Sequence, residues 1–71
     1  MKKISWERYM DLPKNYFADP ASSFLTFGQW FVLNFLPKNE HDPDIYFEPK
    51  MLEVGKIIEQ KYVLKKDNKN E

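Results

Sequence analysis

Residues 24–36 form the most apolar stretch of the chain and restrict how it can fold. Nine of these thirteen residues are apolar, and at about 100° per residue on a helix they do not keep to one side. A helix that is apolar nearly all round must be covered nearly all round. The segment is therefore either the centre of a very small helical bundle or a surface partly reserved for a second protein.

The size and composition of the chain limit how such a helix can be covered. The chain has 71 residues, 42% of them hydrophobic and 17% aromatic, and no cysteine. This length is near the lower limit for a fold held by one hydrophobic core, and disulfides and cysteine-based metal sites are excluded. Stability must come from apolar burial or from oligomerisation, and the composition favours a single folded domain over a disordered chain.

Prolines set the expected ends of the helices. Ser5 is a candidate cap for a short first helix over residues 6–12, which Pro13 is expected to end. In the stretch that follows, up to the next proline, we expect an ordered loop whose Tyr16 and Phe17 rings are buried.

The central helix is expected over residues 24–36, ending before Pro37. Its candidate caps share a hydroxyl that can accept a backbone hydrogen bond: Ser22, Ser23 and Thr26. Gly28 lies inside this helix, where glycine costs about 0.5–1 kcal/mol relative to alanine. Its presence indicates either a close approach of another element or a helix that starts later.

The polar loop after Pro37 leads to a second capping signal. Asp42 followed by Pro43 predicts a cap and a first residue for a helical turn that runs through Phe47. Residues 45–47 are a short apolar run, so a short strand is the alternative there.

Residues 51–64 carry the clearest amphipathic pattern, with Pro49 as the expected first residue of the helix. Its apolar face is spaced three and four residues apart: Met51, Val54, Ile58 and Tyr62. Residues 65–71 are all charged or amide, which predicts a disordered tail. The sequence thus predicts an all-α fold, with one domain of three helices over residues 1–64, joined by aromatic, proline-bearing loops.

The charges do not favour a nucleic-acid or membrane partner. Eleven basic residues balance eleven acidic ones, and Arg8 is the single arginine. The N-terminal lysine pair is not followed by an apolar signal-like segment, and residues 24–36 would span about 20 Å as a helix, short of the roughly 30 Å of a bilayer core. We expect a cytoplasmic protein without a membrane span.

The ligand-type side chains do not form a recognisable site. Residues 39–44 hold five candidate donors, but their spacing matches neither a calcium loop nor a zinc site. His41 is the single histidine and lies in this polar loop, away from the candidate serine nucleophiles. We therefore expect no catalytic residue, no metal, no cofactor and no small-molecule substrate.

The aromatic and aliphatic side chains exceed what three short helices can cover. The excess predicts a surface patch for a protein partner or a second copy of the chain. The candidate contact residues are apolar and lie on the two longer expected helices: Trp30, Leu33, Leu25, Ile57 and Leu52. The alternative is that the aromatic loops close over the helices and complete the cover.

The leading interpretation is a small non-enzymatic protein-interaction module, in a phage-type or bacterial setting, that binds a larger target or itself. The alternative function is a small DNA-binding accessory protein that contacts phosphates through the last lysines: Lys61, Lys65 and Lys66.

Overall fold

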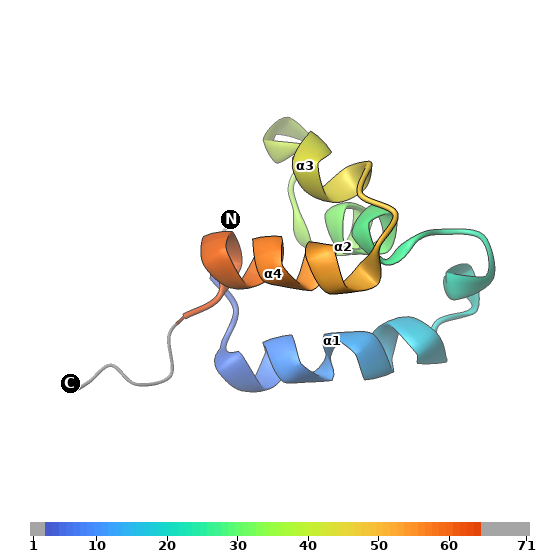
Figure 1. Ribbon diagram of the computed structural model, residues 1–71, viewed down its shortest axis with the longest axis horizontal. Helices are drawn as coiled ribbons and strands as arrows, with labels where there is room; N and C mark the ends of the chain where they lie inside the picture. Colours follow the sequence, from blue (N-terminus) through green and yellow to red (C-terminus); the bar gives the residue numbers. More distant parts are fainter. Residues whose placement is uncertain (1–2, 65–71) are drawn as a thin grey trace.

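The protein is described by a computed structural model over residues 3–64, which is drawn in Figure 1. Within this range the regular elements are helices, joined at one point by an isolated backbone bridge. In chain order they are α1 (Trp6–Ala18), the 3-10 helix η1 (Pro20–Ser23), α2 (Phe27–Phe35), the 3-10 helix η2 (Lys38–Glu40), α3 (Pro43–Tyr46) and α4 (Met51–Tyr62). The predicted all-α class is confirmed, and the predicted tail, residues 65–71, lies outside the described residues.

Helix α1 is longer than the sequence pattern predicts. Its cap is confirmed, because the Ser5 hydroxyl accepts the Arg8 backbone N–H at 3.1 Å. The predicted end at Leu12 is wrong, since the helix continues through Pro13. A proline inside a helix removes one hydrogen bond. Leu12 and Tyr16, one turn apart on either side of it, are both buried, so burial of this face holds the two halves of α1 in line.

The predicted ordered loop after Pro13 is therefore wrong as a loop, because its first residues belong to α1. Tyr16 is buried as predicted, and its hydroxyl donates to the backbone carbonyl of Leu25. Phe17 does not enter the core, since 66% of its surface is exposed. Successive residues on a helix point in directions about 100° apart, so the two rings cannot share one buried face.

Helix α2 starts later than residue 24, at Phe27. The Thr26 hydroxyl accepts the Gln29 backbone N–H at 3.1 Å, and the Gln29 side chain accepts the Thr26 N–H at 3.0 Å. This reciprocal capping box gives a hydrogen-bond acceptor to two backbone N–H groups that would otherwise have none at the start of the helix. The helix ends at its cap residue Leu36, before Pro37, as predicted.

Replacing Thr26 with alanine is expected to lower the free energy of unfolding by about 1 kcal/mol, because the first turn of α2 loses its cap. Urea unfolding followed by circular dichroism measures the change. Ser23→Ala is the matched control, since its hydroxyl donates to the Pro20 carbonyl on an exposed turn and should cost less than half as much. Equal losses in the two variants would contradict the role given to the capping box.

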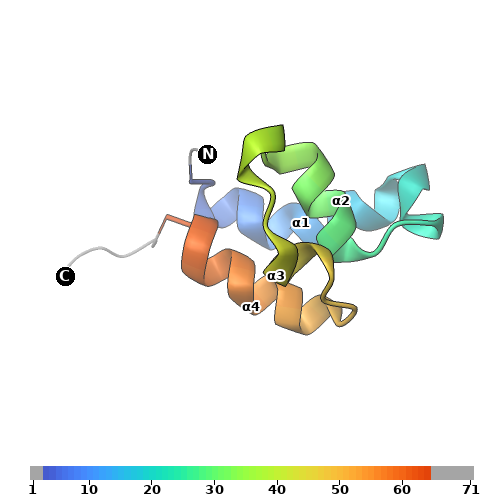
Figure 2. The ribbon, with the colours of Figure 1, turned by 90° about the horizontal axis from the view of Figure 1, so that it is seen from above.

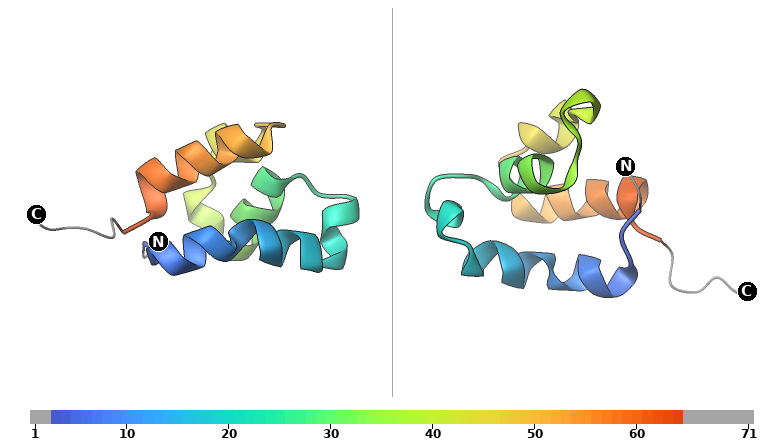
Figure 3. Two further views of the ribbon diagram at one scale, coloured as in Figure 1. Left: turned by 60° about the horizontal axis from the view of Figure 1, so that its bottom comes forward. Right: turned by 180° about the vertical axis from the view of Figure 1, so that it is seen from behind.

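Helix α2 is the centre of the structure, because it contacts α1, α3 and α4, and the left view of Figure 3 shows it between α1 and α4. Most of its apolar residues are buried: Phe27, Trp30, Phe31 and Val32. Its partner on another side is α3, which in Figure 2 lies between α2 and α4. Gly28 is where the backbones of α2 and α3 approach closely, and α2 begins one residue before it, so both interpretations of that glycine are confirmed.

Helix α3 is the predicted helical turn, and the alternative strand over residues 45–47 is wrong. The Asp42 carboxylate accepts the Asp44 N–H at 3.1 Å and so caps the turn, with Pro43 as its first residue. The same carboxylate accepts hydrogen bonds from Tyr62 Oη at 2.8 Å and Lys61 Nζ at 3.1 Å. Asp42 thereby joins the start of α3 to the end of α4.

Helix α4 begins at Met51, two residues after the predicted start at Pro49, and uses Lys50 as its cap residue without a side-chain hydrogen bond. The predicted inner face is confirmed at its centre, because Val54 and Ile58 are fully buried.

Candidate binding groove between α1 and α4

Helices α1 and α4 run in opposite directions along the molecule, as Figure 1 shows, and are tied together at one end. The Ile4 N–H donates to the Tyr62 carbonyl at 2.7 Å, and the Leu64 N–H donates to the Ile4 carbonyl at 2.9 Å. Further along, the Tyr9 hydroxyl donates to the Gly55 carbonyl at 3.0 Å. Beyond this last tie the two helices border an open groove.

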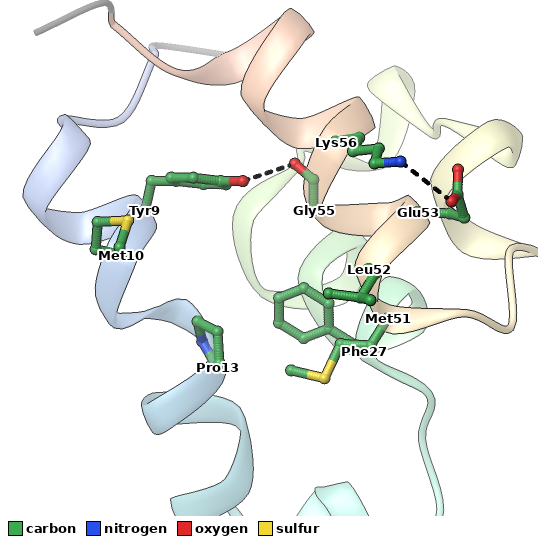
Figure 4. A pocket seen from close by; sticks show the side chains of 9 residues that line it. All are labelled: Tyr9, Met10, Pro13, Phe27, Met51, Leu52, Glu53, Gly55 and Lys56. Carbon is green, nitrogen blue, oxygen red and sulfur yellow. Dashed lines mark hydrogen bonds and ion pairs between the residues drawn. The ribbon is translucent and has the colours of Figure 1, made fainter.

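This groove, called here the α1–α4 groove, has a volume of about 570 Å³ (Figure 4). Its lining comes from three helices: Tyr9, Met10 and Pro13 of α1, Phe27 of α2, and Met51, Leu52, Glu53, Gly55 and Lys56 of α4. Phe27 is 6% exposed and stacks on the buried Trp30 at a ring-centre distance of 5.9 Å. This stacking holds the Phe27 ring in place as part of the groove wall. The volume suits several large apolar side chains.

The polar groups of the groove lie at its edges. Glu53 and Lys56 are one turn apart on α4 and form an exposed ion pair at 3.5 Å. Burial raises the pKa of the Tyr9 hydroxyl, and the nearby charge and hydrogen bond of Glu59 raise it further. Tyr9 is therefore protonated at neutral pH and keeps its hydrogen bond across the closed end of the groove.

A second hollow of about 470 Å³ adjoins the groove beside the last turn of α1. Both hollows are lined by Phe27 and Met51, and the second adds the aromatic rings of Phe17 and Phe24. We call the two together the apolar trough. Along α1 the trough extends from Tyr9 to Phe17, which is about 12 Å, or a little over two helical turns.

Four large apolar side chains of the trough are strongly exposed. Their exposed fractions are 58% for Met10, 66% for Phe17, 76% for Phe24 and 82% for Leu52. Single exposed apolar residues are ordinary on a protein surface, but neighbouring ones around a hollow are typical of interaction sites. Four of the seven exposed large apolar side chains of residues 3–64 therefore lie around the trough, while Leu33, Phe47 and Leu64 lie outside it.

The residues predicted for a partner surface are placed in different environments. Leu52 lines the α1–α4 groove and Leu25 lines the second hollow, so the structure brings these two to the trough. Leu33 is 61% exposed on α2 but lines neither hollow, and Ile57 is half-buried outside them. Trp30 is 4% exposed and is covered by the chain itself.

Trp30 is held by a contact that the sequence pattern does not reveal. Its indole N–H donates to the Asp19 carboxylate at 3.0 Å, while the other oxygen of Asp19 accepts the Ala21 N–H and so caps η1. The hydrogen bonds from Ala21 and then Trp30 lower the pKa of Asp19. The indole therefore has its polar partner within the chain.

Met10, Pro13 and Phe17 are trough residues that the sequence analysis missed. They are spaced i, i+3 and i+7, which places them along one face of a helix. The spacing was available as a signal, but the predicted end of the first helix at Leu12 separated Met10 from the other two.

The basic residues proposed for a DNA contact are not presented as a free cluster. Lys61 lies 3.1 Å from Asp42 and 3.5 Å from Asp44, so two carboxylates neutralise its charge locally. Lys65 and Lys66 lie outside the described residues.

No family model, curated protein or solved structure matches the chain. Over residues 3–64, no helix is both long enough and apolar enough to cross a bilayer. In the same range no three His, Asp or Glu side chains converge as metal ligands would.

Proposed function

We propose that this chain is a small, non-enzymatic protein-interaction module whose contact surface is the apolar trough. The observation that carries the proposal is the set of four exposed apolar side chains around the two adjoining hollows of the trough, which share the buried ring of Phe27 as a wall. Burying apolar surface contributes roughly 25 cal/mol per Å² to the free energy of binding. A partner that fills the trough would bury apolar side chains that are exposed to water in the free chain.

The shape of the trough supports a helical partner segment. Its length of about 12 Å matches the distance from residue i to i+7 on a helix, about 10 Å, which is the usual spacing of anchors in helix-in-groove recognition. Met10 and Met51 border the groove, and methionine side chains adapt to the shape of an incoming side chain. The small size and lysine-rich composition support a phage-type or bacterial modulator that acts in the cytoplasm.

Substituting Leu52 with glutamate is expected to abolish partner binding without unfolding the protein. Leu52 is 82% exposed, so the charge costs little in the free chain but must be desolvated when the trough is filled. The measurement is affinity capture from host extract on immobilised protein, with retained proteins identified and quantified by mass spectrometry. A true partner is reduced at least about 30-fold, the effect of losing an interface hot spot.

Leu33→Glu is the matched control for this experiment. It makes the same chemical change on another exposed leucine, 61% exposed, that lines neither hollow of the trough. Partners retained by the wild type and by Leu33→Glu, but lost with Leu52→Glu, support the proposal. A partner lost with Leu33→Glu and retained with Leu52→Glu would place the contact surface elsewhere on α2.

A further inference from the structure

Resting on the proposed use of the trough, we infer that its occupant is helix α1 of a second copy of this chain. In the inferred dimer each α1 lies in the other copy's trough, and a two-fold axis passes near Pro13. The argument combines the exposed face of α1, the length of the trough and the charges beside it.

The exposed face of α1 carries the anchors that the trough requires. Met10, Pro13 and Phe17 are all exposed and follow the spacing i, i+3 and i+7 along one side of the helix. This side is distinct from the buried side that contains Leu12 and Tyr16. Helix α1 thus buries one apolar face in the core of its own chain and exposes a second apolar stripe to solvent.

The stripe is complementary to a copy of itself. In a two-fold pair, if residue i contacts residue j, then j contacts i. An antiparallel α1–α1 contact centred just after Pro13 sets Met10 of each copy against Phe17 of the other, because the two residues lie at equal distances on either side of that centre. A thioether against an aromatic ring is a favourable contact.

The charges beside the stripe also match a second copy. Asp11 and Lys14 are exposed on α1, on the side of the stripe away from the buried face. In the same antiparallel arrangement, residues on this side of one helix face the same side of the other. Asp11 of each copy then lies within one turn of Lys14 of its partner, which is an attractive arrangement. The chain has no net charge that would oppose self-association.

The available area indicates a weak dimer. At about 200 Å² for a large side chain, the exposed parts of Met10, Phe17, Phe24 and Leu52 amount to roughly 550 Å² in each copy. The pair would bury about 1,100 Å² from these residues, close to the lower limit of about 1,200 Å² for specific, stable interfaces. We therefore expect a weak, transient dimer with a dissociation constant in the micromolar range.

The chain's own last residues do not suit the trough. Residues 65–71 are all charged or amide side chains, so they offer no apolar anchor for a hollow bordered by methionine and phenylalanine. An amphipathic helix from an unrelated protein is the competing occupant, and the experiment below separates it from a second copy.

Disulfide cross-linking of the full chain tests the inferred geometry directly. The natural sequence has no cysteine, so a single introduced cysteine can link only two copies. Lys14→Cys lies next to the two-fold axis, where the paired Cα atoms can approach the 4–7 Å that a disulfide requires. We expect most of this variant to form covalent dimer under mild oxidation, and the matched Leu33→Cys variant to remain at least about tenfold less cross-linked at equal concentration.

Sedimentation equilibrium of the unlinked chain from about 1 to 500 µM supplies the second readout, over a range that spans the expected dissociation constant. Phe17→Glu should weaken dimerisation at least about 30-fold, and Leu33→Glu should leave it unchanged. Asp11→Lys should weaken it at low salt, and the double variant Asp11→Lys/Lys14→Asp should restore it, because the swapped charges attract again. Circular dichroism confirms that each variant is folded.

A wild-type chain that is monomeric at 500 µM, or a dimer that survives Phe17→Glu, overturns this inference. The proposed function is judged separately. A monomer that retains a different protein, lost with Leu52→Glu, removes the second copy as the occupant and keeps the trough as the binding surface. A monomer with no trough-dependent partner contradicts both.

Discussion

Replacing Gly28 with alanine is expected to lower the free energy of unfolding by about 3 kcal/mol or more, at the upper end of overpacking effects. A Cβ atom at this position would lie 2.0 Å from the carbonyl oxygen of Ile45 and 3.0 Å from its carbonyl carbon. Both atoms belong to the backbone of α3, so a rotamer change cannot relieve the clash and α3 must move away from α2. For a chain of this size, whose total stability is about 4–10 kcal/mol, this is a large fraction.

Gly55→Ala is the matched control, because it makes the same change inside α4. There a Cβ atom would meet only the Tyr9 hydroxyl oxygen, at 3.6 Å, which is ordinary contact. Removing a glycine from a helix interior should raise stability by about 0.5–1 kcal/mol. Urea unfolding of the two variants measures the difference, and a Gly28→Ala protein as stable as Gly55→Ala would show that the α2–α3 approach is looser than described.

Replacing Asp42 with alanine is expected to cost about 2–4 kcal/mol, the second largest effect. The carboxylate is 7% exposed and accepts hydrogen bonds from the Asp44 N–H, the Tyr62 hydroxyl and the Lys61 ammonium group. Its loss removes the cap of α3 and leaves the half-buried Tyr62 hydroxyl without its acceptor. Asp44→Ala is the control, since that side chain is 76% exposed and should change stability by less than about 0.5 kcal/mol.

Asp42 also predicts how stability depends on pH. Burial would raise the pKa of this carboxyl, but hydrogen bonds from Tyr62 and Lys61, the Lys61 charge and the Asp44 N–H together hold it below its ordinary value. The carboxyl therefore contributes stability above its unfolded pKa of about 3.9, and this contribution is lost as the pH falls through the lower folded value. Urea unfolding between about pH 2 and 6 should show a decline below about pH 4 that is reduced in Asp42→Asn.

The pKa of the Tyr62 hydroxyl, which donates to Asp42, is shifted in the opposite direction. Burial, followed by the hydrogen bond to Asp42 and its charge, raises the pKa of Tyr62 to about 12. Tyr62 thus remains a hydrogen-bond donor to the ionised Asp42 carboxylate up to a pH of about 12. In the Asp42→Asn variant this donor faces a neutral amide, and absorbance titration should show the pKa of Tyr62 shifting downward. An unchanged value would contradict the coupling of the two groups.

Local signals in the sequence predicted the helix caps well. Ser5, Thr26 and Asp42 each accept a hydrogen bond from a backbone N–H two or three residues later, a relation set by neighbouring residues alone. The end of α1 could not be predicted in this way. Proline disfavours a helix locally, but burial of Leu12 and Tyr16 depends on the core formed with other helices, which no pattern within α1 encodes.

The candidate site was only partly predictable for the same reason. Leu52 and Leu25 were identified because they widen an apolar pattern, and both line the trough. Trp30 lies in the same apolar segment, but the Tyr16 ring packs edge-on against it at a ring-centre distance of 5.5 Å. The Asp19 carboxylate accepts its indole N–H. Both partners come from the region that was expected to be a loop, so no local pattern indicated that Trp30 is covered.

The backbone pairing of Ile4 with Val63 joins positions almost a whole chain length apart. Closing so long a loop costs more chain entropy than the short-range contact between α2 and α3, so we expect it to form late in folding and to open first in the native state. This closure holds one end of the α1–α4 groove, whose two helices are also tied by the Tyr9–Gly55 hydrogen bond and pack on α2. Local opening of the Ile4–Val63 pairing is thus expected to loosen that end of the groove, and a partner that binds only the closed form would in turn stabilise the pairing.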